Sequence, residues 1–155
     1  MRRILTVLAA AVLAACSPSG TTVPDTREAT PILSYTEAFV MEPIGGRDMT
    51  MGGVKVGVEG GNVKLVSATS PAIGTIELHT MAMVDGKMIM RQVEGFDIAD
   101  GETLELKRGG NHFMMFDVGE AVSGGETVDI TLNFEDASGD AMTLVVEADV
   151  RMVGE

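Results

Sequence analysis

The chain has 155 residues, of which 23 are acidic and 11 are basic, so its formal net charge is −12 at pH 7. A protein this acidic is a poor partner for nucleic acids and for anionic lipid headgroups, because like charges repel. The length suits one domain, and the single cysteine excludes both an internal disulfide and a thioredoxin-like pair of thiols.

Residues 1–15 predict a cleaved export signal that is not part of the fold. Arg2 and Arg3 precede an apolar run that is too short to cross a membrane as a stable helix. The run ends in Leu-Ala-Ala-Cys16, which resembles a bacterial lipoprotein box. This resemblance implies cleavage before Cys16 and lipidation of that residue; an ordinary signal peptide with an incidental cysteine is the alternative. Cleavage would remove two arginines and lower the formal charge from −12 to −14.

Residues 16–34 are rich in Ser, Thr, Pro and Gly and predict a flexible tether. Ser17, in place of Asp after the cysteine, resembles lipoproteins that are sent to the outer membrane of Gram-negative bacteria. We therefore expect the protein on the periplasmic side of a bacterial membrane and attached to it only through its lipid. Residues 35–155 would form the folded domain.

From residue 35 onward, short apolar stretches alternate with polar residues and are separated by glycine-containing turns. No segment shows a sustained helical period. The pattern therefore predicts an all-β sandwich or barrel. Its strands are expected at residues 35–42, 54–58, 63–66, 75–78, 87–93, 103–106, 112–118, 127–134 and 142–150.

Both histidines, His79 and His112, lie in a segment that also holds six of the 12 methionines. Imidazole and thioether together suit a soft cation such as Cu(I), and a thioether needs no deprotonation. A single methionine or histidine on a strand is more often a packing residue, so the inference depends on the combination. The absence of a carboxylate at the ligand positions disfavours Ca²⁺ and Mg²⁺, and a blue-copper site would need a cysteine.

The spacing of four residues makes this signal specific: His79, Met90, His112 and Met114 follow the pattern H-x10-M-x21-H-x-M. With its flanking segments at residues 70–71, 77–79, 90–94 and 109–112, the pattern resembles the PCuAC family of periplasmic copper chaperones over about residues 35–150. The resemblance implies a cupredoxin-like Greek-key fold and Cu(I) bound by these four side chains. Cu(II) at the same or an adjacent site is a second candidate cargo.

Strand alternation assigns faces to the remaining residues of the segment. His112 and Met114 share one face, which leaves Phe113 and Met115 for the core. Met88 and Met90 share a face, so alternation does not choose between them; the family spacing favours Met90 and leaves Met88 as a neighbour or substitute. Met81 and Met83 have the parity of His79, and we expect them on a loop over the site.

The resemblance implies a monomeric copper chaperone, not an enzyme. Its acceptor would be cytochrome c oxidase or one of the assembly factors of that oxidase. A copper buffer or resistance protein without a dedicated client is one alternative, and a metal-independent interaction lipoprotein is another. No Ser-His-Asp or paired-carboxylate pattern indicates catalysis.

Overall fold

The computed structural model describes residues 30–152, which fold almost entirely into β-strands. A short 3₁₀ helix, Ile44–Gly46, connects the first two strands. No helix within residues 30–152 is long and apolar enough to cross a membrane. The ten strands are β1 (Ile32–Met41), β2 (Met49–Glu59), β3 (Val63–Thr69), β4 (Ile73–Val84), β5 (Lys87–Gln92), β6 (Phe96–Ile98), β7 (Thr103–Glu105), β8 (His112–Val118), β9 (Thr127–Asp136) and β10 (Ala141–Arg151).

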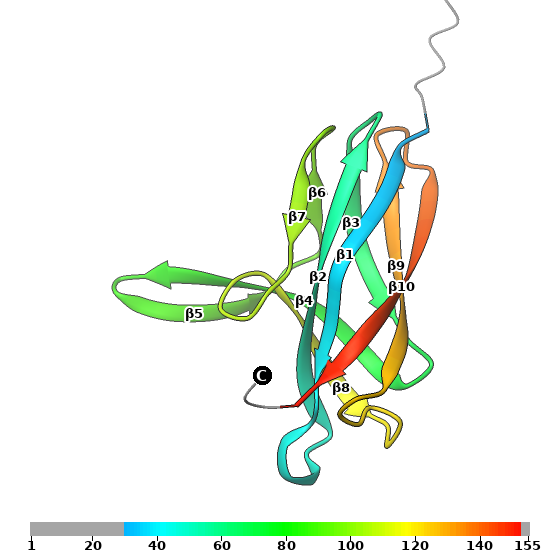
Figure 1. Ribbon diagram of the computed structural model, residues 1–155. Coiled ribbons are helices and arrows are strands. Elements are labelled where there is room, and N and C mark those ends of the chain that lie inside the picture. The colour runs from blue at the N-terminus through cyan, green and yellow to red at the C-terminus, as the bar shows by residue number, and fades with distance from the viewer. Residues whose placement is uncertain (1–29, 153–155) are drawn as a thin grey trace, which may run out of the picture.

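The strands form one open sheet that curves around a single core (Figure 1). Their order is β5-β4-β8-β2-β1-β10-β9-β3-β6, and β7 also pairs with β2. Most neighbours are antiparallel, whereas β1 and β10 are parallel. Strands that are distant in sequence, such as β8 and β2, lie side by side, as Greek-key connections produce. The predicted all-β architecture is confirmed.

Alternation of side chains along the strands builds the core. Val54, Val56 and Val58 of β2 are at most 1% exposed, and Ile130 and Leu132 of β9 belong to the same buried core cluster. Burial of each such side chain stabilises the fold by about 1.5–3 kcal/mol. The side chains on the opposite faces of these strands do not belong to the core, so they can form a binding site.

Several elements differ from the sequence-based expectation. Strand β2 begins at Met49, five residues before the expected start at residue 54. Strand β4 continues to Val84, well beyond the expected end near residue 78. Strand β1 begins at Ile32, so the ordered domain starts three residues before the expected boundary. The three-residue strand β6 was not predicted. The expected signal peptide at 1–15, Cys16 and most of the expected tether lie outside the described residues.

Candidate metal centre

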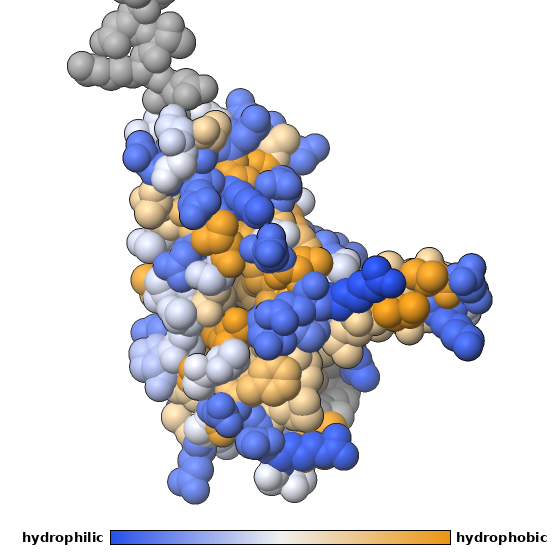
Figure 2. Space-filling view, turned by 180° about the vertical axis from the view of Figure 1, so that it is seen from behind, coloured by the Kyte–Doolittle hydropathy of each residue, from blue (hydrophilic) through white to orange (hydrophobic). Residues whose placement is uncertain are grey.

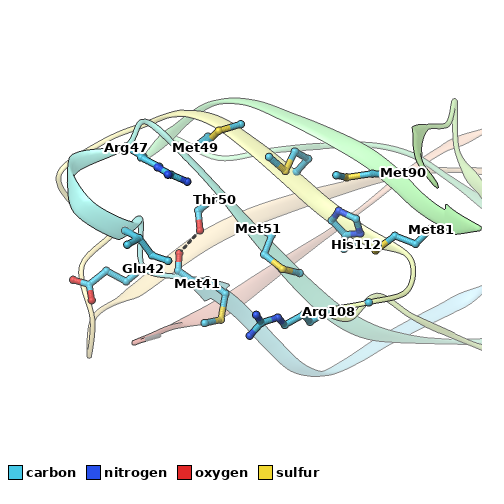
Figure 3. A pocket seen from close by; sticks show the side chains of 13 residues that line it. Met41, Glu42, Arg47, Met49, Thr50, Met51, Met81, Met90, Arg108 and His112 are labelled. Atoms are coloured by element: carbon cyan, nitrogen blue, oxygen red, sulfur yellow. Dashed lines mark hydrogen bonds between the residues drawn. The ribbon is translucent and has the colours of Figure 1, made fainter. Parts of the chain in front are cut away.

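A pocket of about 480 Å³ opens where β8, β2, the β4–β5 hairpin and the end of β1 meet (Figure 3). It lies on the face of β8 that points away from the core. Methionine is its dominant residue type, whereas the buried core of the domain contains a single methionine, Met115. The lining consists of Met41, Glu42, Ile44, Arg47, Met49, Thr50, Met51, Met81, Met90, Arg108, Gly109, His112 and Met114.

Strand β8 places His112 and Met114 at this pocket through its alternation. Phe113 and Met115 are both 0% exposed and belong to the core, which confirms the predicted division of faces. His112 and Met114 line the pocket. His112 is itself only 4% exposed, so its ring is held firmly by its surroundings.

Strand β4 brings His79 beside His112. The two residues are direct partners in the β4–β8 register, and their ring centroids lie 5.7 Å apart at an interplanar angle of 61°. His79 does not itself line the pocket; it lies against His112, with its side chain 13% exposed. Two residues along the same register, Glu77 is the partner of Met114.

Hydrogen bonds leave one ring nitrogen of each histidine available. Nε2 of His79 lies 2.8 Å from Oε2 of Glu77, and an ionised carboxylate can only accept, so Nε2–H is the donor. Nδ1 of His112 donates to the carbonyl oxygen of Gly110 at 2.9 Å. The lone pairs therefore reside on Nδ1 of His79 and Nε2 of His112.

Nδ1 of His79 is buried and, among the described residues, has no hydrogen-bond partner. A buried polar atom without a partner costs about 1–3 kcal/mol, and a bound ion removes this cost. Metal-binding histidines commonly donate their second ring nitrogen to a carboxylate or carbonyl oxygen, as both imidazoles do here. The orphaned nitrogen therefore fits a metal ligand.

The β4–β5 hairpin carries the other methionines of the segment. Met81 pairs with Met90, and Met83 pairs with Met88. The expectation that Met81 and Met83 lie on a loop is wrong, because β4 continues through both positions and pairs with β5.

Met81 and Met90 line the pocket. Met83 and Met88 lie near the tip of the hairpin, where they are 66% and 57% exposed, and they do not line it. The space-filling view shows this hairpin as an arm that projects from the body and carries apolar surface (Figure 2).

A two-residue turn makes the hairpin possible. Asp85 and Gly86 have φ angles of 49° and 74°, the left-handed values that a type I′ turn requires at both central positions. This turn places β5 beside β4 and so brings Met90 opposite Met81. The Asp-Gly signal in the sequence therefore determines the position of Met90.

Sequence reasoning missed four residues of this region. Met41, Met49 and Met51 line the pocket from β1 and β2, far from the segment in sequence. For Met49 and Met51 on β2, the only signal in the sequence was that two apolar residues lie two positions apart. Glu77 had been noted only as part of a flanking segment, although its carboxylate orients His79.

The combined donor set is two neutral nitrogens and several thioethers, which suits a soft, monovalent cation. Within residues 30–152, no three His, Cys, Asp or Glu side chains group as a metal site. Arg47 and Arg108 line the same pocket and add positive charge. Binding here would therefore depend on soft-ligand bonding more than on charge.

Comparison with known proteins gives a family and a fold. Residues 33–149 match the family described as "Putative lipoprotein LpqE-like". The protein named "Putative lipoprotein Lxx21020" from Leifsonia xyli subsp. xyli is 31% identical over 107 residues, which are 68% of this chain and 64% of that relative. The chain thus spans less than two thirds of that relative.

Two solved structures share the architecture. The copper-bound PCuAC domain from PmoF2 superposes with a TM-score of 0.62 at 15% identity, covering 77% of this chain and 92% of that domain. The Cu(I)-bound DR1885 protein from Deinococcus radiodurans gives a TM-score of 0.57 at 30% identity, covering 76% of this chain and 77% of that one. This chain therefore belongs to the LpqE-like lipoprotein family and has the cupredoxin-like fold of the PCuAC domains.

Proposed function

We propose that this protein is an exported, lipid-anchored chaperone that binds one Cu(I) ion tightly and passes it to an acceptor. The observation that carries the proposal is the buried Nδ1 of His79, which has no hydrogen-bond partner among the described residues and belongs to a ring packed against that of His112, itself part of a pocket rich in thioethers. In this proposal, copper is the ion that the protein carries. The related PmoF2 domain has been solved with copper bound, and the DR1885 protein with Cu(I) bound.

In the proposed site, His79 binds through Nδ1, His112 through Nε2, and Met90 and Met114 through sulfur. Met81 is a substitute thioether, because it is the direct strand partner of Met90 and lines the same pocket. The Glu77 carboxylate fixes the tautomer of His79 and offsets the positive charge of the ion from behind the ring. Met88 and Met83 have no role as ligands in this proposal, since they lie outside the pocket.

Release follows from the unequal exposure of these ligands. His112 is 4% exposed, whereas Met90 is 48% exposed at the mouth of the pocket. A donor atom of the acceptor can therefore replace Met90 while the two imidazoles still hold the ion. Stepwise ligand exchange of this kind moves Cu(I) without releasing it into water.

X-ray absorption of the protein loaded with one equivalent of Cu(I) under reducing conditions tests the binding proposal. We expect both nitrogen and sulfur neighbours, and we expect a His79→Ala/His112→Ala variant to lose the nitrogen contribution. A spectrum of oxygen and nitrogen neighbours alone would contradict the proposed ligand set.

Delivery to cytochrome c oxidase or to one of its assembly factors is the finer part of the proposal. Deletion of the gene should lower oxidase activity, and added copper should restore it. Copper sensitivity with normal oxidase activity would instead indicate a buffer or resistance protein. We place the protein on the periplasmic side of a bacterial membrane, through lipid on Cys16, and in the outer membrane if the cell is Gram-negative.

A further inference from the structure

The pocket holds three methionines that the proposed copper site does not use. Met41 ends β1, and Met49 and Met51 begin β2, so they approach the pocket from the side opposite the β4–β5 hairpin. Figure 3 shows Met41 and Met49 toward one end of the pocket, Met81, Met90 and His112 toward the other, and Met51 between them.

Packing alone does not explain them. Met49 is 37% exposed, and Met41 and Met51 are only partly buried, so none of them fills the core. Among the described residues, the buried core consists of Val, Leu, Ile, Phe and Ala, with Met115 as its one methionine. Six of the thirteen pocket-lining residues are methionines, and Ile44 is the one branched aliphatic residue among them. The pocket lining is therefore enriched in methionine specifically, and not in apolar residues in general.

The register of the sheet links these methionines to the proposed copper site. Met51 of β2 is the direct partner of Met114 of β8, and Met114 is in turn the partner of Glu77 of β4. Met114 thus lies between Met51 of β2 and Glu77 of β4, two residues along β8 from His112. A methionine side chain has three rotatable bonds, so its sulfur can turn toward an ion on either side.

We propose that Met41, Met49 and Met51 form a second Cu(I) site that consists of thioethers only. Three neutral sulfur donors suffice for a soft monovalent cation, and they need no deprotonation. Arg47 and Arg108 line the same pocket, so a hard divalent cation would be repelled there without a carboxylate to hold it. Glu42, the acidic residue of the lining, accepts a hydrogen bond from the backbone N–H of Gly124 at 3.2 Å.

This second site binds more weakly than the first, because it contains no imidazole. We infer that copper passes through this second site on its way to or from the two histidines, and this part of the inference rests on the proposed function. The ability of the second site to bind a soft ion does not depend on that function. In a transfer between the sites, the ion exchanges the other ligands of one site for those of the other while the sulfur of Met114 stays bound to it. The ion remains Cu(I) throughout.

Titration with Ag(I), a redox-inert substitute for Cu(I), tests this site. The full-length chain would carry Cys16→Ser to remove its one thiol, be held in detergent, and contain methionine labelled with ¹³C at the methyl group. We expect the first equivalent of Ag(I) to shift the methyl signals of Met90 and Met114. The second equivalent should shift those of Met41, Met49 and Met51.

Four variants make the result decisive. A Met41→Leu/Met49→Leu/Met51→Leu variant should lose the second equivalent and keep the first, and Met51→Leu alone should weaken the second at least tenfold. A matched control, Met83→Leu/Met88→Leu, removes two more exposed methionines outside the pocket and should keep both equivalents. His79→Ala/His112→Ala should lose the first site while the signals of the three methionines still shift.

The outcomes separate the two proposals. Unchanged signals of Met41, Met49 and Met51 at two equivalents, with Met90 and Met114 shifted, would overturn the second site and leave the copper-chaperone proposal intact. Equal loss of the second equivalent in the hairpin control would also overturn it, because the binding would then follow exposure alone. Shifts confined to Met41, Met49 and Met51 would support the second site and contradict the chaperone proposal.

Discussion

At the scale of single residues, the two histidines are held in opposite tautomers by short-range partners. Gly110, two residues before His112, provides a backbone carbonyl, and Glu77, two residues before His79, provides a carboxylate. Glu77 lies on the same face of β4 as His79, because side chains two positions apart on a strand share a face, and Gly110 lies in the bend that precedes β8. The ring orientation is therefore set before any ion binds.

The first prediction concerns Glu77. Glu77→Ala should lower Cu(I) affinity by about 10–100-fold, the range found when such supporting partners of a metal ligand are removed. Glu77→Gln keeps an oxygen that accepts from Nε2–H of His79, so it should restore part of the affinity. Competition with a chromophoric Cu(I) chelator would measure both variants. Wild-type affinity in Glu77→Ala would show that the carboxylate does not orient the ring.

The second prediction contrasts two neighbours on β8. Phe113→Ala should lower the free energy of unfolding by about 3–5 kcal/mol, because this side chain is 0% exposed in the core. Met114→Leu conserves volume and should change stability by less than about 1.5 kcal/mol while it weakens Cu(I) binding strongly. Denaturant unfolding of the metal-free proteins and chelator competition would provide the two readouts. Unaltered Cu(I) affinity in Met114→Leu would remove it from the ligand set.

The sequence predicts site residues that lie on one strand or follow the family spacing. It does not predict site residues that reach the pocket only because strands distant in sequence pair in the fold. The faces of residues 112–115 followed correctly from alternation. Met51 reaches the pocket because β2 pairs with β8, two strands that are separated by more than fifty residues in the chain. The hydrogen bond from His79 to Glu77 depends on side-chain conformations, which a pattern of letters does not contain.

At the scale of elements, the β4–β5 hairpin decides which methionine reaches the pocket. Met90 lies next to the body of the domain, and Met88 lies two residues nearer the tip, where its side chain is 57% exposed. The family spacing and the geometry therefore favour the same residue, by independent arguments.

The third prediction follows: Met90→Leu should weaken Cu(I) binding more than Met88→Leu does. Both substitutions conserve volume at exposed positions, so neither should alter folding measurably. Met83→Leu, opposite Met88, is the control for a methionine outside the pocket. If Met88→Leu were the more damaging variant, the hairpin would have to close further over the pocket than it does in this structure.

Strand β4 is longer than the sequence-based expectation. A loop was expected after His79 because the predicted strand ended there. The residues that follow nevertheless keep the alternation of a strand, and the Asp-Gly turn at 85–86 makes sense only if both flanking segments are extended. Strand β6 escaped notice for another reason, since three residues are too few to show a period.

At the scale of the whole molecule, the fourth prediction concerns attachment. Cys16→Ser should abolish incorporation of labelled fatty acid, because the thiol is the proposed point of acylation. Ser17→Ala, one residue further on, should incorporate label normally. Label found in the Cys16→Ser variant would contradict the lipoprotein assignment for this chain.

The direction of β1 gives the domain a polarity. Its first residue, Ile32, lies at the end of the molecule where the described chain enters, and its last residue, Met41, lines the pocket (Figure 1). Ten residues of extended strand cover roughly 33 Å at about 3.3 Å per residue. In the proposed lipid-anchored protein, the chain that leads from Cys16 enters the domain at the end of β1 opposite the pocket. The length of β1 then separates the pocket from the point of entry, which leaves the pocket open to an acceptor.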